Sequence, residues 1–229
     1  MRALFISHEA DVAPGYLGDA ADRHGIAVDV CELWAGARLP APSDHDLIVP
    51  LGSAEAAYDD SVTWLAAELD YLRRAAADDV PIFGVCFGAQ ALARALGGAV
   101  GPATHPEVGW FTIESDAPHV IDPGPWLEWH FDTLTVPPGA RVLARSAAGV
   151  QAYEVGRHLA VQFHPEVTPA ILDDWITAAY DQLVHHAVDV DALADETRRR
   201  VPHARAAAYR LFDRVVERAG LTATNARGV

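Results

Sequence analysis

The sequence predicts an α/β protein with a mostly parallel open sheet flanked by helices, an antiparallel β addition and a C-terminal helical extension. Three observations support this fold class. Short apolar runs alternate with segments of helical periodicity up to Gly98, as in sheets built from parallel βαβ units. Beyond Gly98 the pattern changes to short strand-like pieces separated by turn residues, and from Val167 onward helical periodicity returns.

Among the first elements, Ala3–Ser7 is a short apolar run that ends at His8 and Glu9, which is typical of a buried strand. Val28–Leu33 alternates apolar and polar residues and indicates an outer strand. In Ser61–Ala77 apolar residues recur at helical spacing with charged residues between them, which predicts an amphipathic helix. The other elements expected here are the helices Pro14–His24 and Gly88–Leu96 and the strands Asp46–Leu51 and Pro81–Val85.

The segment after Gly98 predicts antiparallel hairpins attached to the parallel sheet. Its expected strands are Gly109–Glu114, Leu127–His130, Arg141–Ser146, Val150–Val155 and His158–Phe163. Val167–His186 is then expected to be helical, with Thr168 as its N-cap and Pro169 in its first turn.

The C-terminal part, Asp189–Ala219, predicts a further helix that is interrupted near Pro202, because proline removes a backbone donor. The last residues, Gly220–Val229, are expected to fray. We therefore expect one α/β domain over residues 1–187 and a helical extension over residues 188–229.

The composition limits the possible partners. The chain has 229 residues, of which 51% are hydrophobic and 21% charged, so it can form a substantial core. A net charge of −15 repels phosphate backbones and anionic lipids, so we expect neither nucleic acid nor a membrane as partner. The N-terminus lacks the long apolar region of a secretory signal, and we expect a cytoplasmic protein. Cys31 and Cys86 form no CxxC motif, and we expect no metal and no cofactor.

The most informative segment runs from Gly84 to Gln90, with the sequence GVCFGAQ, between an expected strand and an expected helix. G-x-C-x-G at such a junction resembles a nucleophile elbow, in which small residues permit a strained turn that presents Cys86 at the carboxyl edge of the sheet. The helix N-terminus favours the thiolate, and the Phe87 N–H can donate to a developing oxyanion. Taken alone, the segment is equally compatible with a packed core cysteine.

The second informative segment is VQFHPE, residues 161–166, in which an apolar strand ends at His164 and Glu166 follows two residues later. A thiol nucleophile needs a base, and the base needs an orienting carboxylate. Pro165 restricts the backbone so that both side chains can face one site. A structural histidine followed by a helix-capping glutamate would also fit this segment, but the upstream elbow favours the catalytic interpretation.

These two motifs, in this order, resemble those of class I glutamine amidotransferases, the Cys-His-Glu triad family, and most closely its stand-alone, GMP-synthase-like members. The resemblance runs from Ala3 to about Ala187 and implies a flavodoxin-like amidotransferase fold. Its supporting pieces are EVGW at Glu107–Trp110, WHFDT at Trp129–Thr133 and the run Pro137–Tyr153.

The resemblance implies that Cys86 attacks the carboxamide of glutamine, forms a γ-glutamyl thioester and releases ammonia. His164 would protonate the leaving ammonia and then activate water, while Glu166 would hold His164. Gln90 matches a position that helps to hold the amino-acid end of the substrate. His130, with Asp132, matches a loop near the site and is a candidate for substrate binding.

The expected oxyanion hole departs from the family pattern. The family usually has Gly-Gly-Pro after the third strand, whereas this chain has Pro50-Leu51-Gly52-Ser53. Gly52 aligns with the oxyanion glycine and would act together with the Phe87 N–H. A misaligned hole would cost roughly 2.7–4 kcal/mol of transition-state stabilisation.

The sequence contains neither a G-x-x-x-x-G-K-[ST] P-loop nor a Ser-Gly-Gly-x-Asp-Ser pyrophosphatase loop, so we expect a separate ammonia-accepting synthetase or synthase partner. A γ-glutamyl amide hydrolase with the same triad is the first alternative. A non-catalytic, amidotransferase-like binding subunit is the second, and the altered loop at Gly52 is its best support. A third, weaker alternative is a stress-response protein of related fold in which Cys86 is oxidised. That interpretation gives no role to His164 and Glu166.

Overall fold

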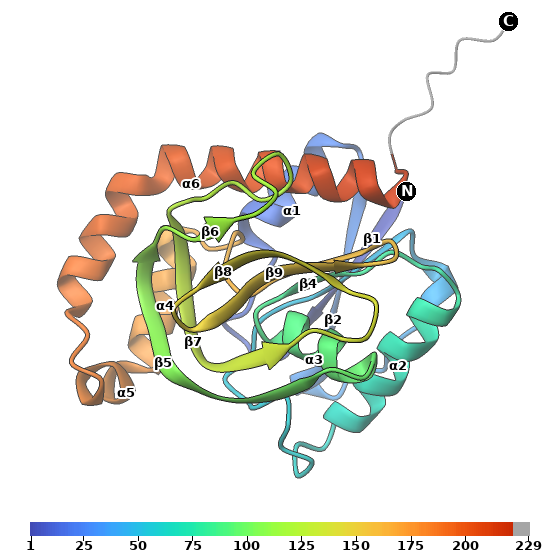
Figure 1. The fold of residues 1–229 in the computed structure, drawn as a ribbon, viewed down its shortest axis with the longest axis horizontal. Helices are drawn as coiled ribbons and strands as arrows, with labels where there is room; N and C mark the ends of the chain where they lie inside the picture. The colour runs from blue at the N-terminus through green and yellow to red at the C-terminus, as the bar shows by residue number, and fades with distance from the viewer. Residues whose placement is uncertain (222–229) are drawn as a thin grey trace, which may run out of the picture.

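The computed structural model describes residues 1–221, so the expected fraying beyond Leu221 lies outside the described residues. The first part of the chain alternates strands and helices along a parallel sheet (Figure 1). Its elements are β1 (Arg2–Ser7), α1 (Gly15–Arg23), β2 (Ala27–Glu32), β3 (Leu47–Pro50), α2 (Leu65–Ala77), β4 (Phe83–Val85) and α3 (Phe87–Ala95), with short 3-10 turns at Leu33–Ala35 and Pro42–Asp44. No helix in residues 1–221 is long and apolar enough to cross a membrane.

The second part adds antiparallel strands and then returns to helices. Its elements are β5 (Ala99–Phe111), β6 (Glu114–Ser115), β7 (Trp126–Thr135), β8 (Arg141–Ser146), β9 (Gly149–Val155), β10 (His158–Val161), α4 (Pro169–Ala178), α5 (Tyr180–His185) and α6 (Val190–Ala219). The predicted α/β class, with its antiparallel addition and C-terminal helix, is therefore confirmed.

The central sheet has two hydrogen-bonded parts, in the orders β2-β1-β3 and β4-β10-β9-β8-β6. A parallel bridge between Ile48 and Ile82 joins β3 to β4, so the two parts continue one another. The pairs β1–β2, β1–β3 and β4–β10 are parallel, whereas β8, β9 and β10 pair antiparallel. The carboxyl ends of β3, β4 and β10 consequently meet at one edge, which is where ligands of open α/β sheets bind.

The β5–β7 ribbon is longer than the sequence predicts. Strand β5 covers Ala99–Phe111 rather than Gly109–Glu114, and β7 extends the expected Leu127–His130 at both ends. Much of β5 is exposed and contains prolines, so it lacks the apolar alternation that marks a half-buried strand. The register shifts between Pro102 and Glu107, and this irregularity accommodates the prolines in a two-stranded ribbon.

The helical C-terminus also differs from expectation. Thr168 caps α4 as predicted, since its hydroxyl accepts from the Ile171 N–H at 3.3 Å. The helix expected to continue to His186 instead breaks at Ala179 into α4 and α5. The predicted interruption at Pro202 is wrong, because α6 runs through it; Figure 1 shows that α6 bends along its length, as proline inside a helix causes.

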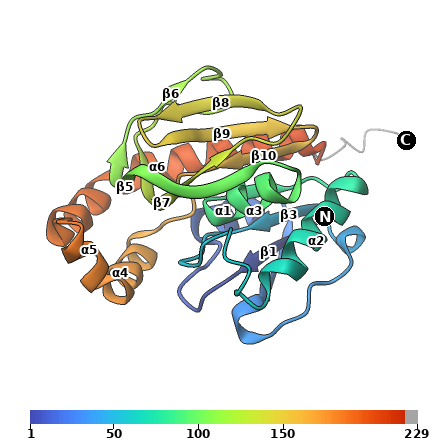
Figure 2. The ribbon, with the colours of Figure 1, turned by 60° about the horizontal axis from the view of Figure 1, so that its bottom comes forward.

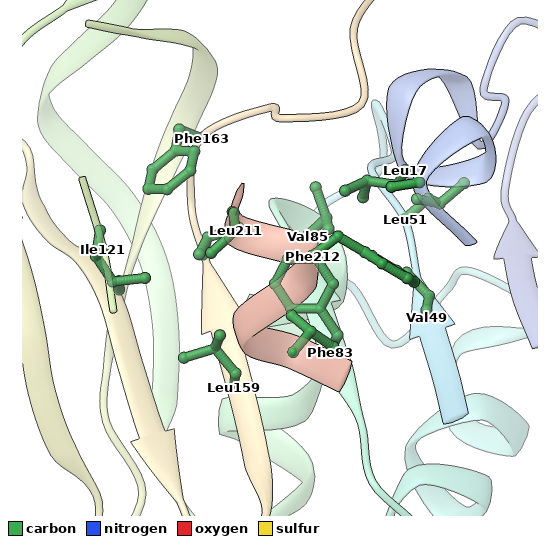
Figure 3. Close-up of a cluster of buried hydrophobic side chains, with 14 of the residues drawn as sticks. Leu17, Val49, Leu51, Phe83, Val85, Ile121, Leu159, Phe163, Leu211 and Phe212 are labelled. Atoms are coloured by element: carbon green, nitrogen blue, oxygen red, sulfur yellow. The ribbon is translucent and has the colours of Figure 1, made fainter. Parts of the chain in front are cut away.

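Helices cover both faces of the central sheet (Figure 2). Successive residues of β1 point to opposite faces: Phe5 packs in the core with α1 and the C-terminal half of α6, and Ile6 packs in the core with α2 and α3. Phe212 of α6 lies among the buried side chains of the first core, near Phe83 and Val85 (Figure 3). The second half of α6 therefore covers the face of the sheet to which Phe5 points, over strand β4.

We expect Phe212→Ala to lower the free energy of unfolding by about 3–5 kcal/mol, because it opens a cavity against the buried strands. Urea denaturation followed by circular dichroism would measure the change. Arg199→Ala, an exposed position on the same helix, is the control and should stay within about 0.5 kcal/mol of wild type. A loss below about 1 kcal/mol for Phe212→Ala would mean that α6 does not belong to the core.

Candidate active site

Cys86 lies in a strained turn between β4 and α3. Its backbone has φ 51° and ψ −109°, a conformation that non-glycine residues rarely adopt and that strand-to-helix nucleophile turns require. Gly88 makes this turn possible, since a Cβ there would lie 2.0 Å from the Pro50 carbonyl oxygen. Hydrogen bonds from the Cys86 N–H to the Val161 carbonyl (2.8 Å) and from the Gly88 N–H to the Leu51 carbonyl (3.0 Å) fix the turn between β10 and β3.

His164 and Glu166 lie just after β10, and both side chains are buried. The His164 N–H donates to the Leu127 carbonyl of β7 at 2.8 Å, which anchors the backbone. The His164 Nδ1–H donates to Glu166 Oε1 at 2.7 Å, so Nε2 is the nitrogen left for chemistry. That Nε2 atom is buried and has no hydrogen-bond partner within residues 1–221.

The electrostatics favour a protonated His164. Burial lowers the pKa of this imidazole, but the Glu166 carboxylate and the nearby Cys86 sulfur outweigh burial and raise the pKa well above its usual value. The sulfur itself accepts from the Gln162 side-chain amide at 3.4 Å and lies 3.9 Å from the Trp129 carbonyl oxygen. The structure thus brings together Cys86, His164 and Glu166, as the two motifs predict.

Gly52 lies against both reacting groups. A Cβ on Gly52 would be 3.1 Å from His164 Cε1 and 4.0 Å from Cys86 Cβ, so a side chain here would crowd the imidazole. Within residues 1–221 the backbone N–H groups of Gly52, Ser53 and Phe87 donate to no other residue. Free N–H groups beside a nucleophile are what an oxyanion hole needs, in spite of the departure from Gly-Gly-Pro.

The Gly52 loop is held by a buried ion pair that sequence reasoning missed. His8 follows β1, and its Nδ1–H donates to the Gly52 carbonyl at 2.9 Å. Its Nε2 lies 3.0 and 3.1 Å from the two carboxylate oxygens of Glu68 on α2. Burial lowers the pKa of His8, but Glu68 outweighs it and the pKa is raised. The only available signal was the position of His8 at the carboxyl end of a strand.

Gln90 and His130 both line the cavity beside Cys86, but most of their polar atoms form hydrogen bonds or ion pairs within the protein. The Gln90 amide donates to Gln162 Oε1 at 3.1 Å, and His130 Nδ1–H donates to the Asp132 carbonyl at 2.8 Å. The expectation that His130 and Asp132 lie in a loop is wrong, since both belong to strand β7. The long ribbon, and not a flexible loop, forms this wall.

Behind His130 lies a buried polar cluster that the sequence did not reveal. His130 Nε2 is 3.3 Å from Glu107 Oε2 and 3.4 Å from Glu128 Oε2. Burial lowers the pKa of His130, but the two carboxylates outweigh it and raise the pKa to about 10. Glu107 also accepts from Ser146 and Gln151, each at 2.8 Å. Glu107 and His130 lie in the EVGW and WHFDT segments, but only the pairing of β5 with β7 and the packing of β7 beside β9 bring the cluster together.

The site opens into a cavity of about 590 Å³ lined by Cys86 and His164. Its walls come from the loops after β1 and β3, from β7 and from the junction of α4 and α5. The volume lies within the roughly 300–1,000 Å³ that binds drug-sized ligands. A nucleophile, an oriented base and free oxyanion donors therefore face one enclosed space, which is the arrangement needed for acyl transfer.

This fold agrees with comparisons to known proteins. The family described as glutamine amidotransferase class-I matches residues 44–178, which is more than half of the chain. The chain therefore belongs to the class I glutamine amidotransferase family. A glutamine amidotransferase of known structure from Thermotoga maritima has a TM-score of 0.86 and 26% identity, covering 95% of this chain and 98% of that one. One from Methylobacillus flagellatus has a TM-score of 0.87 and 26% identity, covering 95% and 94%.

Curated relatives include GMP synthases. The glutamine-hydrolysing GMP synthase of Thermomicrobium roseum is 43% identical over 96 residues, which cover 38% of this chain and 18% of that protein. One subunit of the glutamine-hydrolysing GMP synthase of Ignicoccus hospitalis is 34% identical over 146 residues, covering 60% of this chain and 66% of that relative. The match thus spans less than a fifth of the former protein and about two thirds of the latter.

We expect Glu68→Gln to lower the free energy of unfolding by about 1–3 kcal/mol, because the buried His8 imidazolium loses its charged partner. His8 has a raised pKa in the folded state, so its stabilisation is complete below the unfolded value of about 6.5 and is lost as the pH rises through the folded pKa. The difference between wild type and Glu68→Gln should therefore be full below about pH 6.5 and shrink as the pH rises through the raised folded pKa of His8. Urea titrations at several pH values would measure it.

Asp70→Asn on the exposed face of α2 is the matched control. Its surface ion pairs contribute little, so its unfolding free energy should stay within about 0.5 kcal/mol of wild type at every pH. A Glu68→Gln difference that grows with pH would contradict the assignment of a charged His8.

Proposed function

We propose that this chain hydrolyses the side-chain amide of glutamine through a γ-glutamyl thioester on Cys86. The observation that carries the proposal is the orientation of His164: its Nδ1–H donates to Glu166, and its Nε2 has no hydrogen-bond partner among residues 1–221, while His164 and Cys86 line the same cavity. Membership of the class I amidotransferase family supports the same chemistry.

In the acylation step the Cys86 sulfur attacks the amide carbon, and the carbonyl oxygen becomes an oxyanion. The Gly52 and Phe87 N–H groups would receive that oxyanion, since neither donates elsewhere within residues 1–221. His164, whose raised pKa favours the imidazolium, gives its Nε2 proton to the leaving nitrogen. The C–N bond breaks and ammonia departs.

In the deacylation step His164 is neutral and can accept a proton from water at Nε2. The resulting hydroxide attacks the thioester carbon, the C–S bond breaks and glutamate leaves. Glu166 stabilises the imidazolium that forms at this stage and keeps the ring in one tautomer. The buried position of the pair prevents water from competing for that hydrogen bond.

The fate of the ammonia follows from the relatives. The Ignicoccus relative is named as one subunit of a glutamine-hydrolysing GMP synthase. We infer that this chain likewise releases ammonia and that a separate acceptor enzyme consumes it.

A second candidate, hydrolysis of a γ-glutamyl amide other than glutamine, is favoured by the volume of the cavity, which accommodates a larger leaving amine. It uses the same covalent intermediate on Cys86. A non-catalytic binding role is disfavoured, because the free N–H groups at Gly52 and Phe87 are retained despite the altered loop.

We expect Cys86→Ala to abolish nearly all release of ammonia from glutamine, because the thioester cannot form without the sulfur. A coupled glutamate dehydrogenase assay would measure the loss. Cys31→Ser is the matched control, since Cys31 is equally buried but lies on β2, away from the cavity. A glutamine-derived diazoketone should label Cys86 and leave Cys31 unmodified; wild-type turnover by Cys86→Ala would refute the assignment of the nucleophile.

Glu166→Gln should retain the position of the imidazole but lose the charge that stabilises its protonated form. We expect kcat to fall by roughly 10²–10⁴-fold, less than for Cys86→Ala, because an orienting group contributes less than a nucleophile. The pH profile of kcat/KM should also shift, since Glu166 is the main group that raises the pKa of His164. An unchanged profile and rate would mean that another group orients the base.

A further inference from the structure

The cavity beyond the catalytic sulfur carries an unusual concentration of negative charge. Five carboxylates line it, and no arginine or lysine of residues 1–221 does so. These acidic residues are Glu9, Asp11, Glu55, Asp132 and Asp181. They come from the loops after β1 and β3, from β7 and from α5, so the charge surrounds the space on several sides.

None of these five carboxylates forms a salt bridge within residues 1–221. The arginines of residues 1–221 form ion pairs with many acidic residues elsewhere, but with none of these five. Asp132 accepts a hydrogen bond from the Tyr58 hydroxyl at 3.3 Å, and burial raises the pKa of its carboxyl. Glu9 accepts from Ser53 and Ala54, which are neutral donors. The imidazoles of His130 and His164 also line the cavity, but each has buried carboxylate partners of its own, Glu107 and Glu128 for His130 and Glu166 for His164, so the five carboxylates keep the cavity negative.

Aromatic side chains provide a second, independent observation. Trp129 and Phe131 of β7, Trp175 of α4 and Tyr180 of α5 line the same cavity. Trp175 packs edge-on against His164 at 4.8 Å between ring centroids and against Trp129 at 5.7 Å, so this wall adjoins the catalytic base. Tyr180 is 52% exposed, so its ring is accessible to a ligand in the cavity. Aromatic faces combined with unpaired carboxylates are the chemistry that binds ammonium groups.

We propose that the preferred substrate is a γ-glutamyl amide whose leaving amine carries a second, protonated amino group, as in the monoamides of aliphatic diamines. The inference rests on the proposed Cys86 chemistry and specifies only the leaving amine. The γ-carbonyl group would lie at Cys86, and the ammonium end of the amine would extend among the aromatic side chains and carboxylates. The leaving group of free glutamine is ammonia, which fills less of the cavity and carries no second ammonium group; the α-ammonium group of the glutamyl part is common to all these substrates.

The reaction remains balanced with this substrate. The Cys86 sulfur forms a bond to the carbonyl carbon of the side-chain amide, the C–N bond to the diamine breaks, and His164 Nε2 supplies the proton that the leaving nitrogen takes up. Water then cleaves the thioester, so the products are glutamate, bearing the new carboxylate, and the free diamine. No oxidant, nucleotide or further co-reactant is consumed.

The test compares γ-glutamyl amides that share one chain length and differ in terminal charge. The leaving amines are diaminobutane (cationic), n-pentylamine (neutral) and 5-aminopentanoate (anionic), with glutamine as the fourth substrate, and release of glutamate is the common readout. We expect kcat/KM for the diaminobutane amide to exceed that for the pentylamide by about tenfold or more, and the anionic amide to be the poorest. Added salt should reduce the preference, because it screens the carboxylates.

Asp132→Asn and Asp181→Asn should each reduce the ratio of kcat/KM for the cationic amide to that for the neutral one. Asp116→Asn removes the same charge from a position outside the cavity and should leave the ratio unchanged. Equal or better hydrolysis of the pentylamide or glutamine, with a ratio insensitive to Asp132 and Asp181, would overturn the diamine assignment but leave the Cys86 chemistry intact. A failure to hydrolyse any of the four amides, together with no diazoketone adduct on Cys86, would instead overturn the proposed function.

Discussion

The close contact between the end of β3 and the start of α3 is the constraint on which the site depends. The Gly88 N–H donates to the Leu51 carbonyl, and the Gly88 Cα lies so close to Pro50 that no side chain fits. This contact holds Cys86 at a positive φ and brings Gly52 beside it, so the nucleophile and the expected oxyanion donors are positioned by one junction. The strain of the turn is balanced by the packing of β4 between β3 and β10.

Buried histidine–carboxylate pairs are the second organising feature. These pairs are His164 with Glu166, His8 with Glu68, and His130 with Glu107 and Glu128. Each imidazole has a raised pKa, because its carboxylate partner outweighs the cost of burial. In the proposed mechanism His164 acts on the substrate. His8 holds the Gly52 carbonyl by a hydrogen bond, and His130 links β7 to Glu107 of β5.

Much of this architecture could be read from local patterns. The elements that face the core show strong periodicity, so β1, α1, α2 and α3 were predicted with small errors at their ends. The ribbon of β5 and β7 was underestimated, because an exposed two-stranded ribbon does not require apolar alternation. The sequence predicts an interruption of the last helix near Pro202, whereas α6 continues through it because its second half packs on the sheet.

By itself, the sequence determined the parallel α/β core, and it marked Cys86, His164 and Glu166 as candidate site residues, because they lie in local motifs that follow apolar strands. Only the tertiary structure decided which distant residues complete the site. The pairing of His8 with Glu68 joins positions 60 residues apart, and the carboxylates and aromatic rings of the cavity come from separate parts of the chain. Such contacts arise from the order of the strands and the packing of helices on them, and short sequence patterns carry no record of either.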